Sequence, residues 1–147
     1  MGIRILLADD HKIVLEGLIR LLREQKDIDV VGEARDGLAT VALARELAPD
    51  IIIMDISMPG LSGVEATRQV HKEKPETKII GLSMHAAKRY VQEMYRAGAR
   101  GYLLKDCDFD ELMAAIRAVA AGGTYFAGEF AGVVAAEADR GAAAKGE

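Results

Sequence analysis

The sequence lacks several features that mark large classes of proteins. A single cysteine, Cys107, excludes a disulfide within the chain and suits the reducing cytoplasm. The longest apolar run near the start, residues 5–8, is too short for the core of a signal peptide. No stretch approaches the roughly 20 apolar residues that cross a bilayer. We therefore expect a soluble, cytoplasmic protein with no membrane partner.

Positive charge is also scarce. The chain has 19 Lys and Arg against 23 Asp and Glu, which gives a net charge of −4. A compact DNA-binding module normally carries a basic face, so we do not expect nucleic acid to be a direct partner of this chain. The 147 residues, of which 50% are apolar and 29% charged, have the composition of an ordinary globular domain with a short extension.

Short apolar runs alternate with amphipathic stretches along most of the chain. The runs cover residues 3–8, 28–32, 51–54, 78–82 and 101–104. Because they are continuous rather than alternating, they predict strands that are buried on both faces. The stretches between them show helical periodicity. Capping boxes begin two of these helices at Ser62 and Asp108, and Gly98 suits a left-handed helix end. Successive β–α units predict an α/β fold, a doubly wound parallel sheet.

The composition changes after the glycine pair at residues 122–123. From residue 127 onward Ala, Gly and Glu dominate, with one small apolar cluster at residues 130–134. We interpret residues 1–122 as one domain. Residues 123–147 are then the start of a linker, a short helix grading into a flexible segment.

Chemically competent side chains stand at the ends of four predicted strands. Asp9 and Asp10 follow the first strand and Asp55 follows the third. Ser83 ends the fourth, and Lys105 follows the fifth. The carboxyl ends of parallel strands meet at one edge of the sheet, where such folds bind ligands. Three carboxylates at that edge would repel each other unless a cation joined them, and their hard oxygens suit Mg²⁺.

Phosphoryl transfer is the chemistry that fits this set. A central Asp55 can attack phosphorus and become an aspartyl phosphate, which adds about 1.5 to 2 negative charges. Lys105 can pair with a phosphoryl oxygen, and Ser83 can donate a hydrogen bond to another. Each residue alone also has an ordinary explanation: a helix cap, a turn cap, a solvated lysine or a strand-end serine. Their joint placement favours the functional interpretation.

Four segments of the chain carry a family resemblance. Residues 7–11 (LADDH), 54–60 (MDISMPG), 82–83 (LS) and 101–105 (GYLLK) resemble the receiver domains of bacterial two-component response regulators. Residues 17–18, 31–34, 83–85 and 97–102 make the chain most similar to the NarL/FixJ type. In that type a linker and a LuxR-like helix-turn-helix follow the receiver. The resemblance implies a flavodoxin-like receiver fold with five helices and five parallel strands in the order 2-1-3-4-5.

The resemblance also implies roles for individual residues. Asp55 would accept the phosphoryl group from a sensor histidine kinase. Asp10 and Asp55 would bind Mg²⁺ through their side chains, Ser57 through its backbone carbonyl and Asp9 through a water. Tyr102 matches the family's switch aromatic and would rotate inward when the serine at the end of the fourth strand moves toward the phosphate.

Several other polar residues need a separate interpretation. Ser57 and His85 would flank the path of water to the acyl phosphate, so we expect them to tune dephosphorylation. We expect His11 to lie on a first helical turn facing solvent or a partner, and His71 to be solvated helix surface. We assign no redox role to Cys107. The cations Lys88, Arg89 and Arg96 are interpreted as a solvated helix face near a protein-docking surface.

Two functions remain open at this point. In the first, the receiver controls a LuxR-type transcription effector that lies outside this chain, homodimerises on phosphorylation and meets DNA only through that effector. In the second, it is a stand-alone receiver that docks a partner protein or relays phosphate. A third function, a flavodoxin-like or nucleotide-binding domain without phosphotransfer, is remote because neither glycine-rich phosphate loop occurs, and a bound flavin would support it. We expect a phosphoacceptor switch that assists its own phosphorylation and dephosphorylation, not an enzyme with a separate substrate.

Overall fold

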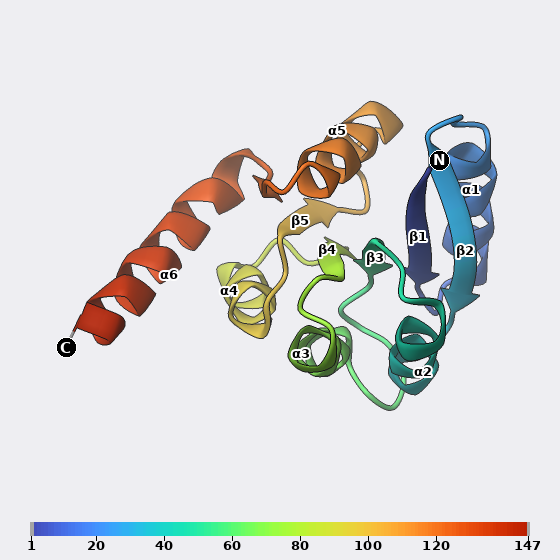
Figure 1. Cartoon of the computed structure of the whole chain (residues 1–147). Coiled ribbons are helices and arrows are strands. Elements are labelled where there is room, and N and C mark those ends of the chain that lie inside the picture. Colours follow the sequence, from blue (N-terminus) through green and yellow to red (C-terminus); the bar gives the residue numbers. More distant parts are fainter. Residues whose placement is uncertain (1, 147) are drawn as a thin grey trace.

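A computed structural model describes residues 2–146, and the side chains of residues 2–141, as a three-layered α/β structure (Figure 1). The described residues hold six strands in one parallel sheet, in the order β2-β1-β3-β4-β5-β6. The strands are β1 (Ile3–Ala8), β2 (Ile28–Ala34), β3 (Ile51–Met54), β4 (Lys78–Ser83), β5 (Gly101–Leu104) and β6 (Tyr125–Phe126). The predicted class and the order of the first five strands are confirmed.

Helices cover both faces of the sheet (Figure 1). One face packs against α1 (Lys12–Arg23) and α5 (Phe109–Ala120). The other packs against α2 (Gly37–Leu47), α3 (Gly63–Glu73) and α4 (Lys88–Ala97). A sixth helix, α6 (Gly128–Gly146), lies against α4. Each face therefore has its own apolar core, and the strands between them are buried from both sides, as all four residues of β3 are.

Local signals in the sequence set the helix ends. The Ser62 side chain accepts a hydrogen bond from the Glu65 N–H at 3.2 Å, and Asp108 accepts one from the Glu111 N–H at 2.8 Å. These bonds satisfy amides that have no partner inside the first helical turn. Gly98 ends α4 with φ 114°, in the left-handed region that favours glycine. The two caps and Gly98 act as expected, whereas the side chains of Glu65 and Glu111 bond to Arg68 and Tyr125 instead of completing the predicted capping boxes.

The segment after residue 122 is more ordered than we expected. Tyr125 and Phe126 pair with β5 and add a sixth strand, where five were predicted. The following residues form one helix of 19 residues instead of a short helix grading into a flexible linker. Tertiary contacts account for the difference, because Phe130 and Glu137 of α6 are buried against the rest of the molecule. The division into a domain at 1–122 and a linker at 123–147 stays a prediction.

Within residues 2–146, no helix is both long enough and apolar enough to span a bilayer.

Candidate functional site

Strand register brings the predicted residues to one edge of the sheet. Ala8 of β1 pairs with Met54 of β3, so the residues that follow them, Asp9 and Asp55, are neighbours. The Asp55 N–H donates to the Ala8 carbonyl at 2.9 Å and extends this pairing by one residue. On the other side, the Lys105 N–H donates to the Ser83 carbonyl at 2.8 Å.

The acidic side chains form a compact cluster. One ligand atom from each of Asp9, Asp10, His11 and Asp55 lies within 4.8 Å of the others. Asp9 and Asp55 are buried, Asp55 with 3% of its surface exposed. Among the described residues, Asp10 Oδ1 and Asp55 Oδ2 are buried without a hydrogen-bond partner. Buried carboxylate oxygens without partners are costly, and the oxygen donors here suit a hard divalent cation.

Lys105, which follows β5, supplies positive charge to the cluster. Its side chain is only 6% exposed, and Nζ lies 2.9 Å from Asp9 Oδ2 and 3.4 Å from Asp55 Oδ2. The ammonium therefore pairs more closely with Asp9 than with Asp55. Asp9 Oδ1 also accepts a hydrogen bond from the His11 N–H at 2.8 Å. Both Asp9 oxygens are thus engaged by the protein, whereas Asp55 Oδ2 lacks a hydrogen bond from the described residues.

The charge on Asp55 is poorly compensated. Burial, and next the negative charge of Asp9, together raise the pKa of Asp55 from 3.8 to about 6, although Lys105 opposes both effects. The side chain must ionise to act as a nucleophile or as a metal ligand. A cation beside it would stabilise the ionised form.

His11 is exposed, as expected, but it lies just before the helix and not on its first turn. It is the residue that precedes α1, and its ring faces the acidic cluster although its side chain is 56% exposed. Nδ1 lies 3.0 Å from Asp9 Oδ1 and 3.2 Å from Asp10 Oδ1. The signal available in the sequence was its position directly after the acidic pair.

A chain of hydrogen bonds connects Ser83 with Tyr102. Ser83 is buried, and its Oγ accepts from the His85 N–H at 3.0 Å. The Tyr102 hydroxyl donates to the His85 carbonyl at 2.6 Å. Tyr102 is 0% exposed, and burial raises its pKa to about 12. Tyr102 thus points into the molecule in this structure, and its rotation on phosphorylation stays a prediction.

The His85 ring lies over Ser57. Its Nε2 is 3.1 Å from Ser57 Oγ, and the ring stacks on Tyr90 with centroids 4.4 Å apart. Two contacts thus hold the ring, and the two residues predicted to tune dephosphorylation touch each other. The effect of this pair on dephosphorylation stays a prediction.

Sequence reasoning missed Gly63. A Cβ added there would overlap the Asp55 carbonyl oxygen and crowd Ile56. The Gly63 N–H also donates to the Ile56 carbonyl at 2.7 Å. The absent side chain lets the start of α3 lie directly against the backbone of the Asp55 loop. The available signal was a glycine directly after the helix-capping serine.

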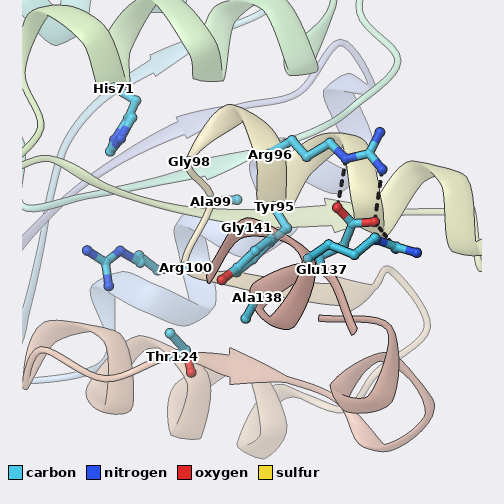
Figure 2. Close-up of a pocket in the computed structure, with 11 residues that line it drawn as sticks. His71, Tyr95, Arg96, Gly98, Ala99, Arg100, Thr124, Glu137, Ala138 and Gly141 are labelled. Atoms are coloured by element: carbon cyan, nitrogen blue, oxygen red, sulfur yellow. Dashed lines mark hydrogen bonds and ion pairs between the residues drawn. The ribbon is translucent and has the colours of Figure 1, made fainter. Parts of the chain in front are cut away.

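Other residues considered from the sequence lie away from the cluster. Lys88, Arg89 and Arg96 are exposed, as expected, and Arg96 also pairs with Glu137 of α6. Burial raises the pKa of Cys107 to about 11, which keeps the thiol protonated and unreactive. His71 lines a hollow between α4 and α6 (Figure 2).

A parallel α/β sheet with a buried acidic cluster and an adjacent lysine at its carboxyl edge defines the class of receiver domains. Residues 5–117 match the family described as the response regulator receiver domain, and the chain belongs to this family.

Individual relatives agree with this assignment and narrow it to the NarL/LuxR type. The transcriptional regulatory protein DegU of Brevibacillus brevis is 42% identical over 123 residues, which cover 84% of this chain and 52% of DegU. A LuxR-family two-component response regulator from Aurantimonas sp. SI85-9A1 superposes with a TM-score of 0.86 at 38% identity, covering 93% of this chain and 98% of that one.

A third relative has been solved with DNA. RcsB from Salmonella enterica serovar Typhimurium, bound to promoter P1flhDC in the presence of the phosphomimetic BeF₃⁻, gives a TM-score of 0.81 at 26% identity. The match covers 91% of this chain and 67% of RcsB. The chain spans about half the length of DegU, the transcriptional regulator that it matches.

Proposed function

We propose that Asp55 is the phosphoacceptor of a switch that a sensor histidine kinase drives. An Asp55 carboxylate oxygen forms a bond to phosphorus while the bond from phosphorus to the kinase histidine breaks, and the histidine nitrogen leaves with the bonding pair. The observation that carries the proposal is the buried Asp55 Oδ2, which lies in the acidic cluster and 3.9 Å or less from both His11 and Lys105.

The same cluster supports Mg²⁺ as the cofactor. We assign the side chains of Asp10 and Asp55 and the backbone carbonyl of Ser57 as its protein ligands. Asp9, whose two oxygens already bind Lys105 and His11, would act through a metal-bound water. When bound, the ion offsets negative charge on the carboxylates and the phosphoryl oxygens.

Two further residues would bind oxygens of the phosphoryl group on Asp55. Lys105 lies close enough to Asp55 Oδ2 to pair with a phosphoryl oxygen after a small movement. Ser83 Oγ accepts from the His85 N–H and still has a proton to donate to another phosphoryl oxygen. We assign Ser57 and His85 to the control of dephosphorylation because their side chains contact each other. Ser57 lies two residues after Asp55, and His85 lies two residues after Ser83.

For the complete protein we propose control of a LuxR-type helix-turn-helix effector. DegU is a transcriptional regulatory protein and RcsB binds a promoter, and both are longer than this chain. Phosphorylation would favour a homodimer, with DNA contacted only by the effector. The alternative is a stand-alone receiver that docks a partner or relays phosphate, and the coding sequence beyond Glu147 separates the two. The cytoplasmic location stays a prediction.

Intact-mass analysis tests the phosphoacceptor directly. The protein is incubated with a small phosphodonor and Mg²⁺, and we expect a labile, phosphate-sized mass gain in the wild type. Asp55→Asn should show no gain. Asp29→Asn, which changes an exposed carboxylate on β2, should behave like the wild type. A gain of equal size in Asp55→Asn would refute the assignment.

A further inference from the structure

An ion pair holds α6 on α4. Glu137 of α6 is only 7% exposed and accepts two hydrogen bonds from Arg96 of α4, from Nε at 2.7 Å and from Nη2 at 2.9 Å (Figure 2). Arg140, one turn further along α6, also pairs with Glu137. The planar, two-point geometry of this contact fixes one position of α6 on α4.

An aromatic contact joins the start of α6 to the switch residue of the receiver. Phe130 is buried, and its ring meets that of Tyr102 edge to face, with centroids 5.1 Å apart and an interplanar angle of 81°. Phe130 therefore forms part of the wall around the Tyr102 ring. A movement of either ring removes the contact from the other.

Tyr102 is tied to the candidate phosphorylation site. Its buried hydroxyl donates to the His85 carbonyl, and the His85 N–H donates to Ser83 Oγ. A buried hydroxyl that loses its acceptor is destabilising, so the Tyr102 ring follows the His85 carbonyl when this loop moves. A continuous series of contacts thus connects the site to α6, through Ser83, His85, Tyr102 and Phe130.

We propose that α6 is a latch, and that phosphorylation of Asp55 weakens its docking on α4. This inference rests on the proposed function of Asp55. When Ser83 turns its hydroxyl to a phosphoryl oxygen on Asp55, the His85 carbonyl moves toward β3. In the sheet order, β3 lies on the side opposite to β6 and the start of α6. Tyr102 follows the carbonyl and leaves Phe130, so the docking of α6 loses its aromatic contact and depends on the ion pair and the apolar contacts of Val133 and Val134.

Linkage makes the coupling reciprocal. If occupation of the Asp55 site loosens α6, then loosening α6 by mutation must strengthen ligand binding at the Asp55 site, by at most the ratio of the affinities of the undocked and docked states. The BeF₃⁻ ion with Mg²⁺ serves as the probe, because it mimics the phosphoryl group without a covalent step. Its dissociation constant is therefore an equilibrium quantity that can be compared between variants.

The first measurement is hydrogen exchange of the α6 amides in the whole chain. On addition of BeF₃⁻ and Mg²⁺ we expect exchange over residues 128–141 to become about fivefold faster or more, a typical size for coupling between sites. Amides around Asp55 should become slower at the same time, which confirms that the probe is bound. Unchanged or slower exchange in α6 with the probe bound would overturn the latch and leave the phosphoacceptor assignment intact.

The second measurement compares affinities for BeF₃⁻. Glu137→Gln removes the charge of the ion pair and keeps the shape of the side chain, and Phe130→Leu removes the aromatic contact. We expect each to bind the probe about fivefold more tightly than the wild type. Glu73→Gln is the matched control, because it breaks a similar two-point pair with Arg45, at 2.7 and 2.5 Å, between α3 and α2.

The control should keep wild-type affinity. If Glu137→Gln and Phe130→Leu also keep it, the latch is refuted. A wild-type chain that neither binds BeF₃⁻ nor gains mass from a phosphodonor would refute both the phosphoacceptor assignment and the latch.

Discussion

Replacing Asp55 by asparagine should stabilise the metal-free protein at neutral pH. In the folded chain the pKa of Asp55 is raised from 3.8 to about 6, chiefly by burial and next by the charge of Asp9. Since each pKa unit corresponds to about 1.36 kcal/mol, the ionised side chain costs the folded state about 3 kcal/mol. Asparagine has nearly the same shape and carries no charge, so Asp55→Asn avoids this cost.

The pH dependence of the gain follows from proton binding. Between about pH 4 and 6 the folded wild type holds a proton that the unfolded chain has lost, so its stability falls as the pH rises through this range. Above pH 6 the full cost is present, and below pH 4 it is absent. The difference between Asp55→Asn and the wild type should therefore be close to zero at pH 4 and approach about 3 kcal/mol at pH 7.5.

Urea unfolding in EDTA, followed by circular dichroism at several pH values, measures this difference. Other carboxylates titrate in both proteins and cancel in the subtraction. Asp29→Asn, on an exposed side chain, should show no such pH-dependent gain. A gain at pH 7.5 that is below about 1 kcal/mol, or that persists at pH 4, would refute the reasoning. Mg²⁺ at 100 times its dissociation constant should stabilise the wild type by about 2.7 kcal/mol and Asp55→Asn by much less.

Four further substitutions test other parts of the structure. Gly63→Ala should lower the free energy of unfolding by about 2 kcal/mol or more, because its Cβ overlaps the Asp55 carbonyl. Gly17→Ala, whose Cβ meets no described atom within 4 Å in the middle of α1, should instead stabilise by about 0.5 to 1 kcal/mol in the same urea titration. Lys105→Met should weaken BeF₃⁻ binding about tenfold or more in calorimetry, since a charge-assisted bond is lost, and unchanged affinity contradicts its role. His85→Ala should change the lifetime of the phosphorylated protein, measured by the decay of the added mass, and an unaltered lifetime would remove it from the dephosphorylation step.

The strands and the acidic edge could be predicted because their signals are local. A buried parallel strand such as β3 needs apolar residues on both faces, and this requirement is visible as a continuous apolar run. Once the strands are placed, the topology alone brings Asp9 and Asp55 together. The capping bonds of Ser62 and Asp108 depend only on residues three positions away and were equally visible.

What could not be predicted depends on distant partners. The α6 segment is rich in Ala and Gly and has little amphipathic pattern, so its position follows from Arg96, which is 41 residues from Glu137. The inward position of Tyr102 depends on the His85 carbonyl, 17 residues away, and on Phe130. The approach of Gly63 to Asp55 arises because the loop between β3 and α3 folds back on itself.

The short strand β6 fixes the position of the first residues of α6. The Tyr125 N–H donates to the Arg100 carbonyl at 2.9 Å, so the chain is anchored to the outer edge of the sheet immediately before the helix begins. At 1.5 Å per residue, α6 is a rod of about 28 Å. A tilt of about 10° at its anchored end would carry its far end through about 5 Å, the length of one helical turn. A small rearrangement beside Tyr102 can thus be magnified into a displacement large enough to reposition whatever the helix carries.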